Sequence, residues 1–325
     1  MSLSSALGLV QTALELGLIS SLTVLALFLS YSMLNVCDLS TDGCFTLGAV
    51  VGAAGRAELN DQKQQFAQME RFVAQSLEEM TDAMLSGVVS GFITAILQTK
   101  MGVNSLLSGI IVNTALYSVN IGVMGGSSIL NMNKTETVFT RAKDMLSGGI
   151  LGSQYKLFVI VIAVLAIAVI LGLFLRTRLG LAIRATGNNP DMVRSSSINP
   201  AFTTIVGLCV ANSFTALSGC LLAQSQKSVN IDIGSGMVTI ALASLLIGNV
   251  FMGRRKMPLR IFGMVIGAFV FRLVYTVALR FNMPAFMLKL VSSVIVVAAI
   301  SIPYLKEQLP LYKRKLAQRN GRRAA

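Results

Sequence analysis

The chain contains no histidine and no tryptophan, and only 13% of its 325 residues are charged. Without histidine, Ser-His-Asp triads, histidine acid–base catalysis and the usual His-containing metal sites are excluded. Soluble domains carry about 25% charged residues, so this chain has too few charges to cover a water-exposed exterior. Its 54% hydrophobic residues exclude disorder. The composition therefore predicts a membrane protein that crosses the bilayer several times.

Cysteines are also sparse. Cys37, Cys44, Cys209 and Cys220 lie in or beside apolar segments, and no CxxC pair occurs. Neither a metal site nor a disulfide framework is indicated, and we expect no bound cofactor. A formal charge of +13 would suggest nucleic acid in a soluble protein. Here the basic residues fall between apolar runs, so they indicate how the chain is oriented in the membrane. We expect membrane lipid around the chain and no nucleic-acid partner.

Long apolar runs account for most of the chain. A helix needs about 20 apolar residues to cross the hydrocarbon core, and the stretches long enough are 14–36, 103–124, 157–175, 201–225, 258–279 and 284–304. Shorter apolar stretches, typical of broken or re-entrant helices, occur at 44–54, 84–98 and 237–252. We predict an all-α transmembrane bundle of about eight spans with short broken or re-entrant helices, in one domain over 1–325.

Lysine and arginine gather in the loop 176–200, in residues 254–260 and in the tail 305–325. Such residues mark the cytoplasmic side of a membrane protein. An even number of predicted spans separates each group from the next, so all three groups can lie in the cytoplasm. The same count places the C-terminus inside, and the uncharged N-terminus and residues 125–156 outside.

Residues 55–83 interrupt the apolar sequence. They carry three basic and six acidic residues, and this negative balance agrees with an external position. Apolar side chains recur there at spacings of three and four, which favours an amphipathic helix. We expect this atypical polar segment to be a helix on the membrane surface or packed against the bundle, the alternative being an anomaly of the sequence.

The loop 176–200 contains a helix signal. Asn189 can serve as the N-cap, Pro190 suits the first helical position, and Asp191 places an acid in the first turn. The helix can run only about two turns, because Pro200 disfavours the helical backbone conformation in the residue that precedes it. The loop is either an ordinary positively charged connection or a short helix that docks into a cytoplasmic partner.

Polar residues inside predicted spans are candidates for a solute path. Asn113, Tyr117 and Asn120 recur at i, i+4 and i+7, so they share one helix face. They could bind a zwitterionic or hydroxylated solute, or serve only in hydrogen bonds between helices. Arg272 lies deep in a span and should face a partner or a cavity, whereas Lys289 lies near a span end and should reach the interface.

Small residues indicate close helix contacts. Glycines four residues apart permit such contacts, and these pairs are Gly48 with Gly52, Gly87 with Gly91, and Gly263 with Gly267. DLSTDGCFTLGAV (38–50) is also similar to NIDIGSGMVTIAL (230–242). This likeness, if not due to chance, predicts two half-domains that each contain a broken helix.

Three stretches carry a resemblance to a known family: ILQTKMGVNSLLSGIIVNTALYSVN (96–120), LAIRATGNNPDMVRSSSINP (181–200) and GSGMVTIALASLLIGNVF (234–251). The second is similar to the EAA-type coupling loop of ABC importer permeases. The chain resembles the permease family serving branched-chain amino acids, ribose and related solutes, and within it the branch linked to aromatic or other hydrophobic amino acids. Residues 55–83 depart from the family, in which apolar sequence would continue.

The resemblance implies a permease subunit in a bacterial inner membrane. Two such chains, as a homodimer, would work with cytoplasmic ABC ATPase subunits and with an extracellular or periplasmic solute-binding protein that delivers a small solute such as an amino acid. This chain has no G-x-x-x-x-G-K-[ST] phosphate loop, so ATP would be bound and hydrolysed by the partner and the chain is not expected to be an enzyme. By similarity, the residues in or beside the ATPase-contacting element are Arg184, Gly187, Asn189, Pro190, Asp191 and Arg194.

Other functions stay open at this point. An ion-coupled secondary transporter usually needs carboxylates or histidines inside the membrane, and Glu15 and Asp232 lie only at the edges of predicted spans. A membrane scaffold would leave the capped loop without a role. An ABC permease for a sugar or a nucleoside, rather than for an amino acid, is a further alternative.

Overall fold

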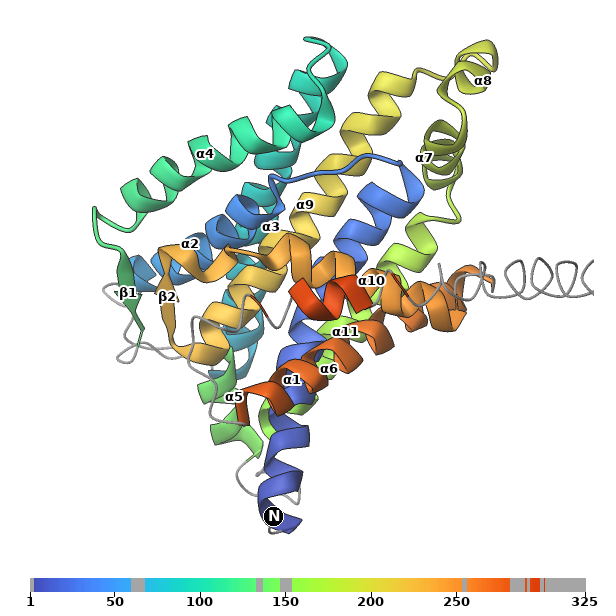
Figure 1. Ribbon diagram of the computed structural model, residues 1–325. Coiled ribbons are helices and arrows are strands. Elements are labelled where there is room, and N and C mark those ends of the chain that lie inside the picture. The colour runs from blue at the N-terminus through green and yellow to red at the C-terminus, as the bar shows by residue number, and fades with distance from the viewer. Residues whose placement is uncertain are drawn as a thin grey trace, which may run out of the picture.

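The computed structural model describes residues 3–59, 68–132, 137–146, 154–252, 256–280, 290, 293–298 and 301. These residues form a bundle of helices (Figure 1), which are α1 (Leu3–Leu27), the π-helix η1 (Phe28–Met33), α2 (Thr41–Leu59), α3 (Gln68–Thr99), α4 (Ser105–Val123), α5 (Val138–Leu146), α6 (Tyr155–Phe174), α7 (Arg178–Asn188), α8 (Pro190–Ser195), α9 (Pro200–Gln226), the 3₁₀ turn η2 (Ile231–Gly234), α10 (Met237–Met252) and α11 (Met257–Arg280). The short strands β1 (Ile129–Asn131) and β2 (Ser228–Asn230) pair antiparallel.

Seven helical segments of the described chain are long and apolar enough to cross a membrane. They are Gly8–Met33, Leu77–Thr99, Ser105–Val123, Tyr155–Phe174, Pro200–Gln226, Ile231–Met252 and Met257–Ala278. The prediction of an all-α bundle with several spans is confirmed. The predicted span 284–304 lies largely outside the described residues, and Lys289 and the tail 305–325 lie wholly outside them.

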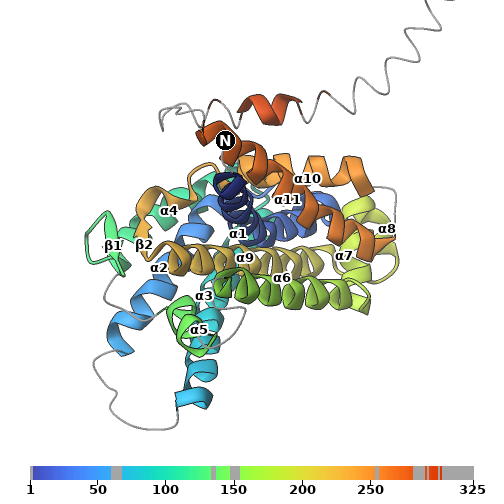
Figure 2. The same cartoon turned by 90° about the horizontal axis from the view of Figure 1, so that it is seen from below.

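Helix α9 forms the centre of the bundle, and its residues 211–224 are all buried. Figure 2 shows it in the middle of the molecule, with α1 on one side and α6 on the other. A side chain on Gly48 of α2 would collide with the carbonyl group of Ala216, and one on Gly87 of α3 would collide with that of Asn212. The close helix contacts predicted from the glycine pairs therefore exist. The partner of the pairs in α2 and α3 is α9, whereas the pair in α11 contacts α10, where a side chain on Gly267 would collide with the carbonyl oxygen of Ser244.

Residues 55–83 are helical over most of their length. Helix α2 extends to Leu59, and α3 begins at Gln68 and continues as one 32-residue helix to Thr99. The expected helix is confirmed for those parts, and residues 60–67 lie outside the described chain. The apolar stretch 84–98 is only the second half of α3. The membrane-spanning segment found in α3 is Leu77–Thr99, and it includes Met80, which packs against the core.

The loops gather at two ends of the bundle. Figure 1 shows α8 and the turn between α3 and α4 at the upper end, with the N-terminus, α5 and the β1–β2 pair toward the lower end. Arg176, just after α6, lines one groove together with Met257 and Pro258 at the start of α11. This arrangement agrees with the predicted topology, in which Lys100, the loop 176–200 and the residues before α11 share one face.

Helices are interrupted at both segments of the internal likeness. The first break (residues 34–40) follows η1, contains Asn35 at a φ of 57°, and ends where α2 begins. The second break (residues 231–236) follows β2, consists of η2 and a short turn with Gly236 at a φ of 84°, and ends where α10 begins. The predicted broken helices are thus present in both halves.

Candidate functional site

A polar cavity of about 310 Å³ lies where α2, α4 and the second break come together. The residues that line it are Asp42, Gly43, Thr46, Asn113, Thr114, Tyr117, Asn120, Ile231, Asp232 and Ser235. Two of them are acidic, and none of these lining residues in the described chain is a lysine or an arginine. This cavity, called the polar pocket below, therefore favours a solute group that is positively charged or donates hydrogen bonds.

Asp42 connects the first turn of α2 to the second break. Its Oδ2 accepts a hydrogen bond from the backbone N–H of Gly236 at 3.0 Å, and its Oδ1 accepts one from Val238 at 2.8 Å. A carboxylate is stabilising at this position, because the first N–H groups of a helix have no partner within the helix. A side chain on Gly234 would collide with the Asp42 carbonyl oxygen, so the two backbones are in direct contact. The N-terminal ends of α2 and α10 are thus held together at the pocket wall.

All three residues predicted for a solute path line the polar pocket. Tyr117 is 50% exposed, whereas Asn120 is 1% exposed and donates from Nδ2 to the carbonyl oxygen of Gly43 at 3.3 Å. The Oδ1 atom of Asn120 is buried and has no hydrogen-bond partner in the described chain. Asn113 lies beside them, with its Oδ1 against Gly43. Asn120 therefore joins two helices, as the structural alternative proposed, and Tyr117 is the member of this face that is most exposed at the pocket.

Asp38, in the first break, was missed by the sequence analysis. Its side chain is 2% exposed and accepts hydrogen bonds from the Ser40 N–H at 2.8 Å, the Ser40 hydroxyl at 2.6 Å and Asn212 Nδ2 at 2.8 Å. The last bond joins the first break to α9. Asp38 stands just beyond the predicted span 14–36, so the search for carboxylates inside spans passed over it. The only available signal was an acid followed closely by serine at the end of an apolar run.

The expectation that carboxylates lie only at the edges of spans was wrong. Glu15 lies within the span Gly8–Met33 and accepts a hydrogen bond from Gln11 Nε2 at 3.2 Å. Glu79, within the span of α3, is 2% exposed and accepts one from Gln224 Nε2 at 3.2 Å. Glu79 was missed because the apolar stretch taken from the sequence began only at residue 84. The carboxylate count therefore does not distinguish an ion-coupled transporter from an ABC permease.

Arg272 has neutral partners, which the sequence could not name. The residue is 8% exposed, and its Nε donates a hydrogen bond to the Ser20 hydroxyl of α1 at 2.9 Å. Its guanidinium carbon lies 5.7 Å from the centre of the Tyr275 ring, and Nη2 lies 4.0 Å from the sulfur of Met237. The prediction that Arg272 faces a partner is confirmed, and its contacts fasten α11 to α1 and to the start of α10.

The helix predicted in the loop 176–200 is present as α8. The Asn189 side chain accepts hydrogen bonds from the N–H groups of Asp191 and Met192, both at 3.1 Å, and Pro190 occupies the first turn. Val193 is 2% exposed and anchors the helix from below. Of the predicted coupling residues, those with exposed side chains are Asn189, Pro190, Asp191 and Arg194.

The two remaining coupling residues lie on α7, which packs against the bundle. A side chain on Gly187 would collide with the carbonyl oxygen of Met33 at the end of η1, and Arg184 is half-buried. The hydroxyl groups of Thr186 and Thr203 lie 2.7 Å apart and join α7 to α9. Gly187 thus belongs to the contact between α7 and η1 and not to the protruding surface. We call α7 and α8 together the coupling element.

Within the described residues, no group of three His, Cys, Asp or Glu side chains is arranged to hold a metal ion. Cys37, Cys44, Cys209 and Cys220 are free thiols. The chemistry that the described chain offers is therefore that of hydrogen-bonding and acidic groups at the polar pocket, together with the exposed helix α8.

Comparison with known proteins adds a family to this geometry. The family model described as branched-chain amino acid transport system, permease component, matches residues 9–300. The chain belongs to this permease family. The permease is 29% identical over 301 residues to the tyrosine transport system permease protein of Clostridioides difficile, with 92% of this chain and 93% of that protein covered. No solved structure matches it.

More distant relatives of the permease are named for other solutes. It is 26% identical over 240 residues to the galactose/methyl galactoside import permease protein MglC of Salmonella typhimurium, covering 73% of this chain and 69% of that one. It is 24% identical over 173 residues to the nucleoside ABC transporter permease protein NupB of Lactococcus lactis, covering 49% and 48%. The permease is therefore a multi-pass membrane protein of the ABC transporter class, and its family alone does not determine its solute.

Proposed function

We propose that the permease is the membrane-spanning subunit of an ABC importer that carries an amino acid into a bacterial cell. A solute-binding protein outside the inner membrane delivers the amino acid, and a separate cytoplasmic ATPase binds and hydrolyses ATP. The observation that carries this proposal is the combination, in one chain of this family, of a polar pocket at the second helix break and an exposed, capped helix, α8.

Helix α8 is the part of the permease that contacts the ATPase. Its cap and its buried Val193 hold it in one position, while Pro190, Asp191 and Arg194 are exposed for contact. A preorganised short helix can dock into a groove on a partner without first paying the cost of ordering it. Gly187 supports α8 from behind, through the packing of α7 on η1, and the half-buried Arg184 lies on the same helix α7.

A continuous set of contacts connects the coupling element to the polar pocket. Gly187 contacts the end of η1, the first break then leads to Asp38 and its bond to α9, and Asp42 holds the start of α10. When the ATPase subunits close, movement of α8 shifts η1 and therefore the wall of the pocket. This is alternating access by displacement of packed helices.

The chemistry of the polar pocket favours an amino acid over a sugar or a nucleoside. Asp42 and Asp232 offer negative charge to the pocket. Ammonium groups have three donors and no acceptor, so an α-ammonium group suits this set. Tyr117 presents a half-exposed aromatic ring beside it, which suits an aromatic or apolar solute side chain. The tyrosine permease relative points to the same solute class.

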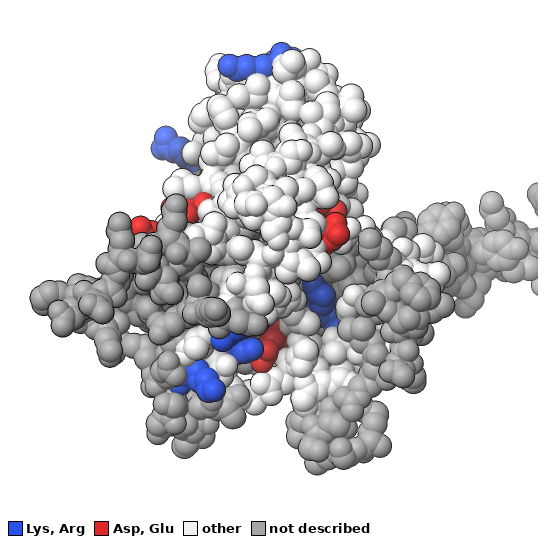
Figure 3. Space-filling view, turned by 90° about the vertical axis from the view of Figure 1, so that its left-hand side faces the viewer, with Lys and Arg blue, Asp and Glu red and all other residues white. Residues whose placement is uncertain are grey.

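The exposed face of α4 is our candidate for contact with the second permease chain of a homodimer. Figure 3 shows the flank that carries α4, whose upper part is uncharged except for basic atoms near its edge. The large exposed apolar side chains of α4 are Leu106, Leu107, Ile110, Ile111, Val119 and Val123. A second chain on this face would place the polar pocket beside the seam between the two copies. The positive-inside pattern puts α8 and the C-terminus in the cytoplasm.

The proposal is tested by uptake into proteoliposomes that contain the permease, its ATPase and its binding protein. We expect ATP-dependent uptake of labelled tyrosine. In Asn113→Leu the rate of uptake should fall about tenfold or more, because the lost hydrogen bond to the solute is worth about 1–3 kcal/mol. Ser118→Leu is the matched control, because Ser118 lies on the same helix, is exposed and does not line the pocket.

Three results would contradict parts of the proposal. Uptake driven by an ion gradient without ATP would show a secondary transporter. Uptake of galactose or a nucleoside in place of tyrosine would refute the amino-acid assignment and leave the ABC importer intact. Normal uptake in Asn113→Leu would remove Asn113 from the solute path.

Asp191→Arg is the corresponding test of α8. We expect this variant to fold normally and to lose co-purification with the ATPase.

A further inference from the structure

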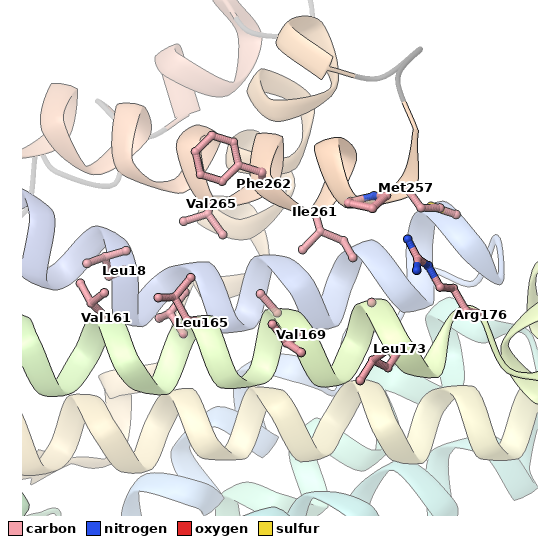
Figure 4. Close-up of a pocket in the computed structure, with 14 residues that line it drawn as sticks. Leu18, Val161, Leu165, Val169, Leu173, Arg176, Met257, Ile261, Phe262 and Val265 are labelled. Carbon is pink, nitrogen blue, oxygen red and sulfur yellow. The ribbon is translucent and has the colours of Figure 1, made fainter.

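A second cavity lies far from the polar pocket, between α1, α6 and α11. It is an open groove of about 420 Å³, and its walls are Leu18, Val161, Val164, Leu165, Ala168, Val169, Gly172, Leu173, Arg176, Met257, Pro258, Ile261, Phe262 and Val265. Figure 4 shows the apolar side chains of α6 and α11 facing one another along the groove, with the Arg176 guanidinium at one end beside Met257. Arg176 is the one charged residue among these walls.

The groove lies within the membrane-spanning part of the permease. Its two main walls belong to the spans Tyr155–Phe174 and Met257–Ala278, and the first has the highest mean hydropathy of the described spans, 3.4. Rim residues Leu165, Val169 and Phe262 are all more than half exposed. From Val161 to Arg176 the groove runs about 22 Å along α6, which exceeds the roughly 15 Å of hydrocarbon in one leaflet. Its surroundings are therefore acyl chains, and water is not a suitable occupant.

Arg176 determines which lipid fits. It follows the end of α6 on the face predicted to be cytoplasmic, and its side chain is exposed. Within the described chain, no acidic residue lines the groove to neutralise it. The planar guanidinium binds phosphate oxygens through two parallel hydrogen bonds. Exposed Lys256 stands next to Met257 at the same end, and basic residues at the inner surface attract anionic lipid headgroups.

Gly172 keeps the floor of the groove open. A Cβ atom there would meet only the Cδ1 of Ile261, at an ordinary 3.5 Å. By contrast, a Cβ on Gly180 would collide with the carbonyl oxygen of Phe174. Backbone packing therefore requires glycine at 180 and does not require it at 172. A larger side chain at 172 would occupy the groove without displacing the helices.

We propose that this groove binds one anionic phospholipid of the inner leaflet, with an acyl chain between α6 and α11 and the phosphate on Arg176. The charge of Arg176 and the uninterrupted apolar walls together match a molecule with one anionic end and a long hydrocarbon chain. The bound lipid fills the space between α11 and α6 and lies at the end of the bundle from which α7 begins.

Native mass spectrometry of the full-length permease tests the proposal, with phosphatidylglycerol and phosphatidylcholine added at equal concentrations. We expect one phosphatidylglycerol per chain to bind in preference to phosphatidylcholine. Arg176→Gln should weaken phosphatidylglycerol binding about fivefold, the effect of one basic residue near an anionic surface, and leave phosphatidylcholine unchanged. Lys100→Gln, at the turn between α3 and α4, is the charge control and should have no effect.

Gly172→Leu should reduce binding of both lipids, because it fills the groove, whereas Gly122→Leu on exposed α4 should change neither. If Gly172→Leu does not fold, Leu165→Trp at the exposed rim makes the same test. Equal binding of both lipids to the unaltered permease would overturn the proposal, as would a headgroup preference that survives Arg176→Gln. Crosslinking of Val169→Cys to a second permease chain in membranes would also overturn it, because another copy would then occupy the groove.

Discussion

The two helix breaks begin from similar sequences and have different environments. The first break is fixed in the interior, since the Asp38 side chain is 2% exposed and makes three hydrogen bonds, one of them to α9. The second break lies at the rim of the polar pocket, and its Asp232 is exposed. We therefore propose that the first break supports the fold and that the second presents groups to the solute.

Asp42 is the element that relates the two breaks to each other. It belongs to the helix that follows the first break. Its two carboxylate oxygens accept hydrogen bonds from Gly236, the last residue of the second break, and from Val238 of α10. We therefore propose that movement of η1, which contacts Gly187 of the coupling element, reaches the pocket wall through Asp42. Variants at these positions distinguish residues that stabilise the fold from residues that contact the solute.

The largest effect is expected for Asp38→Ala. The change leaves the Asn212 amide and the Ser40 N–H buried without their acceptor, at a cost of about 3 kcal/mol in the free energy of unfolding. Asp232→Ala, which changes the exposed acid of the second break, should alter that free energy by less than about 0.5 kcal/mol. Thermal unfolding of both purified variants in detergent measures the difference, and equal losses would show that the two breaks are not distinct.

A smaller loss is expected for Gly234→Ala. The new methyl group collides with the Asp42 carbonyl oxygen, and overpacking of this kind costs about 1–3 kcal/mol. Gly236→Ala is the matched variant, because nothing lies within 4 Å of its Cβ position and only its φ of 84° is unfavourable. Gly234→Ala should unfold at the lower temperature and lose ATP-driven uptake. Lower stability in Gly236→Ala would place the strain in the turn and not in the contact.

The smallest effect on stability is expected for Asp42→Ala, which removes two acceptors at the start of α10 and should cost about 1 kcal/mol. Its effect on transport should be larger than its effect on folding, because the contact between the two breaks is lost. Uptake and unfolding measured on the same preparation distinguish these outcomes. Asp42→Asn keeps one acceptor oxygen and should recover part of the uptake that Asp42→Ala loses. If Asp42→Asn recovers no uptake, the negative charge of Asp42 is what transport requires.

Local features of the permease could be predicted from its sequence. The spans follow from apolar length, and the cap of α8 follows from Asn189 and the two residues after it, because both signals lie within a few residues. The helix in 68–83 was also expected from spacing. The Asn113, Tyr117 and Asn120 face was identified because helical periodicity alone brings those residues together.

The contacts between distant parts of the chain could not be predicted in this way. Asp38 meets Asn212 across 174 residues, and Arg272 meets Ser20 across 252. Such pairs depend on how α1, α9 and α11 pack, and no local pattern encodes that packing. Asp38 and Asp42 were also overlooked because carboxylates were sought inside spans, whereas these two stand at a break where backbone N–H groups need acceptors.

The central claim is that the polar pocket is part of the solute path and changes with the ATP cycle. Its most direct test is the labelling of Ser235→Cys by a membrane-impermeant thiol reagent, in a variant whose four native cysteines are alanine. We predict rapid labelling from outside the membrane without ATP, and slower labelling during ATP hydrolysis with solute-loaded binding protein present. An equal rate in both conditions, or labelling from the cytoplasmic side alone, would contradict the claim.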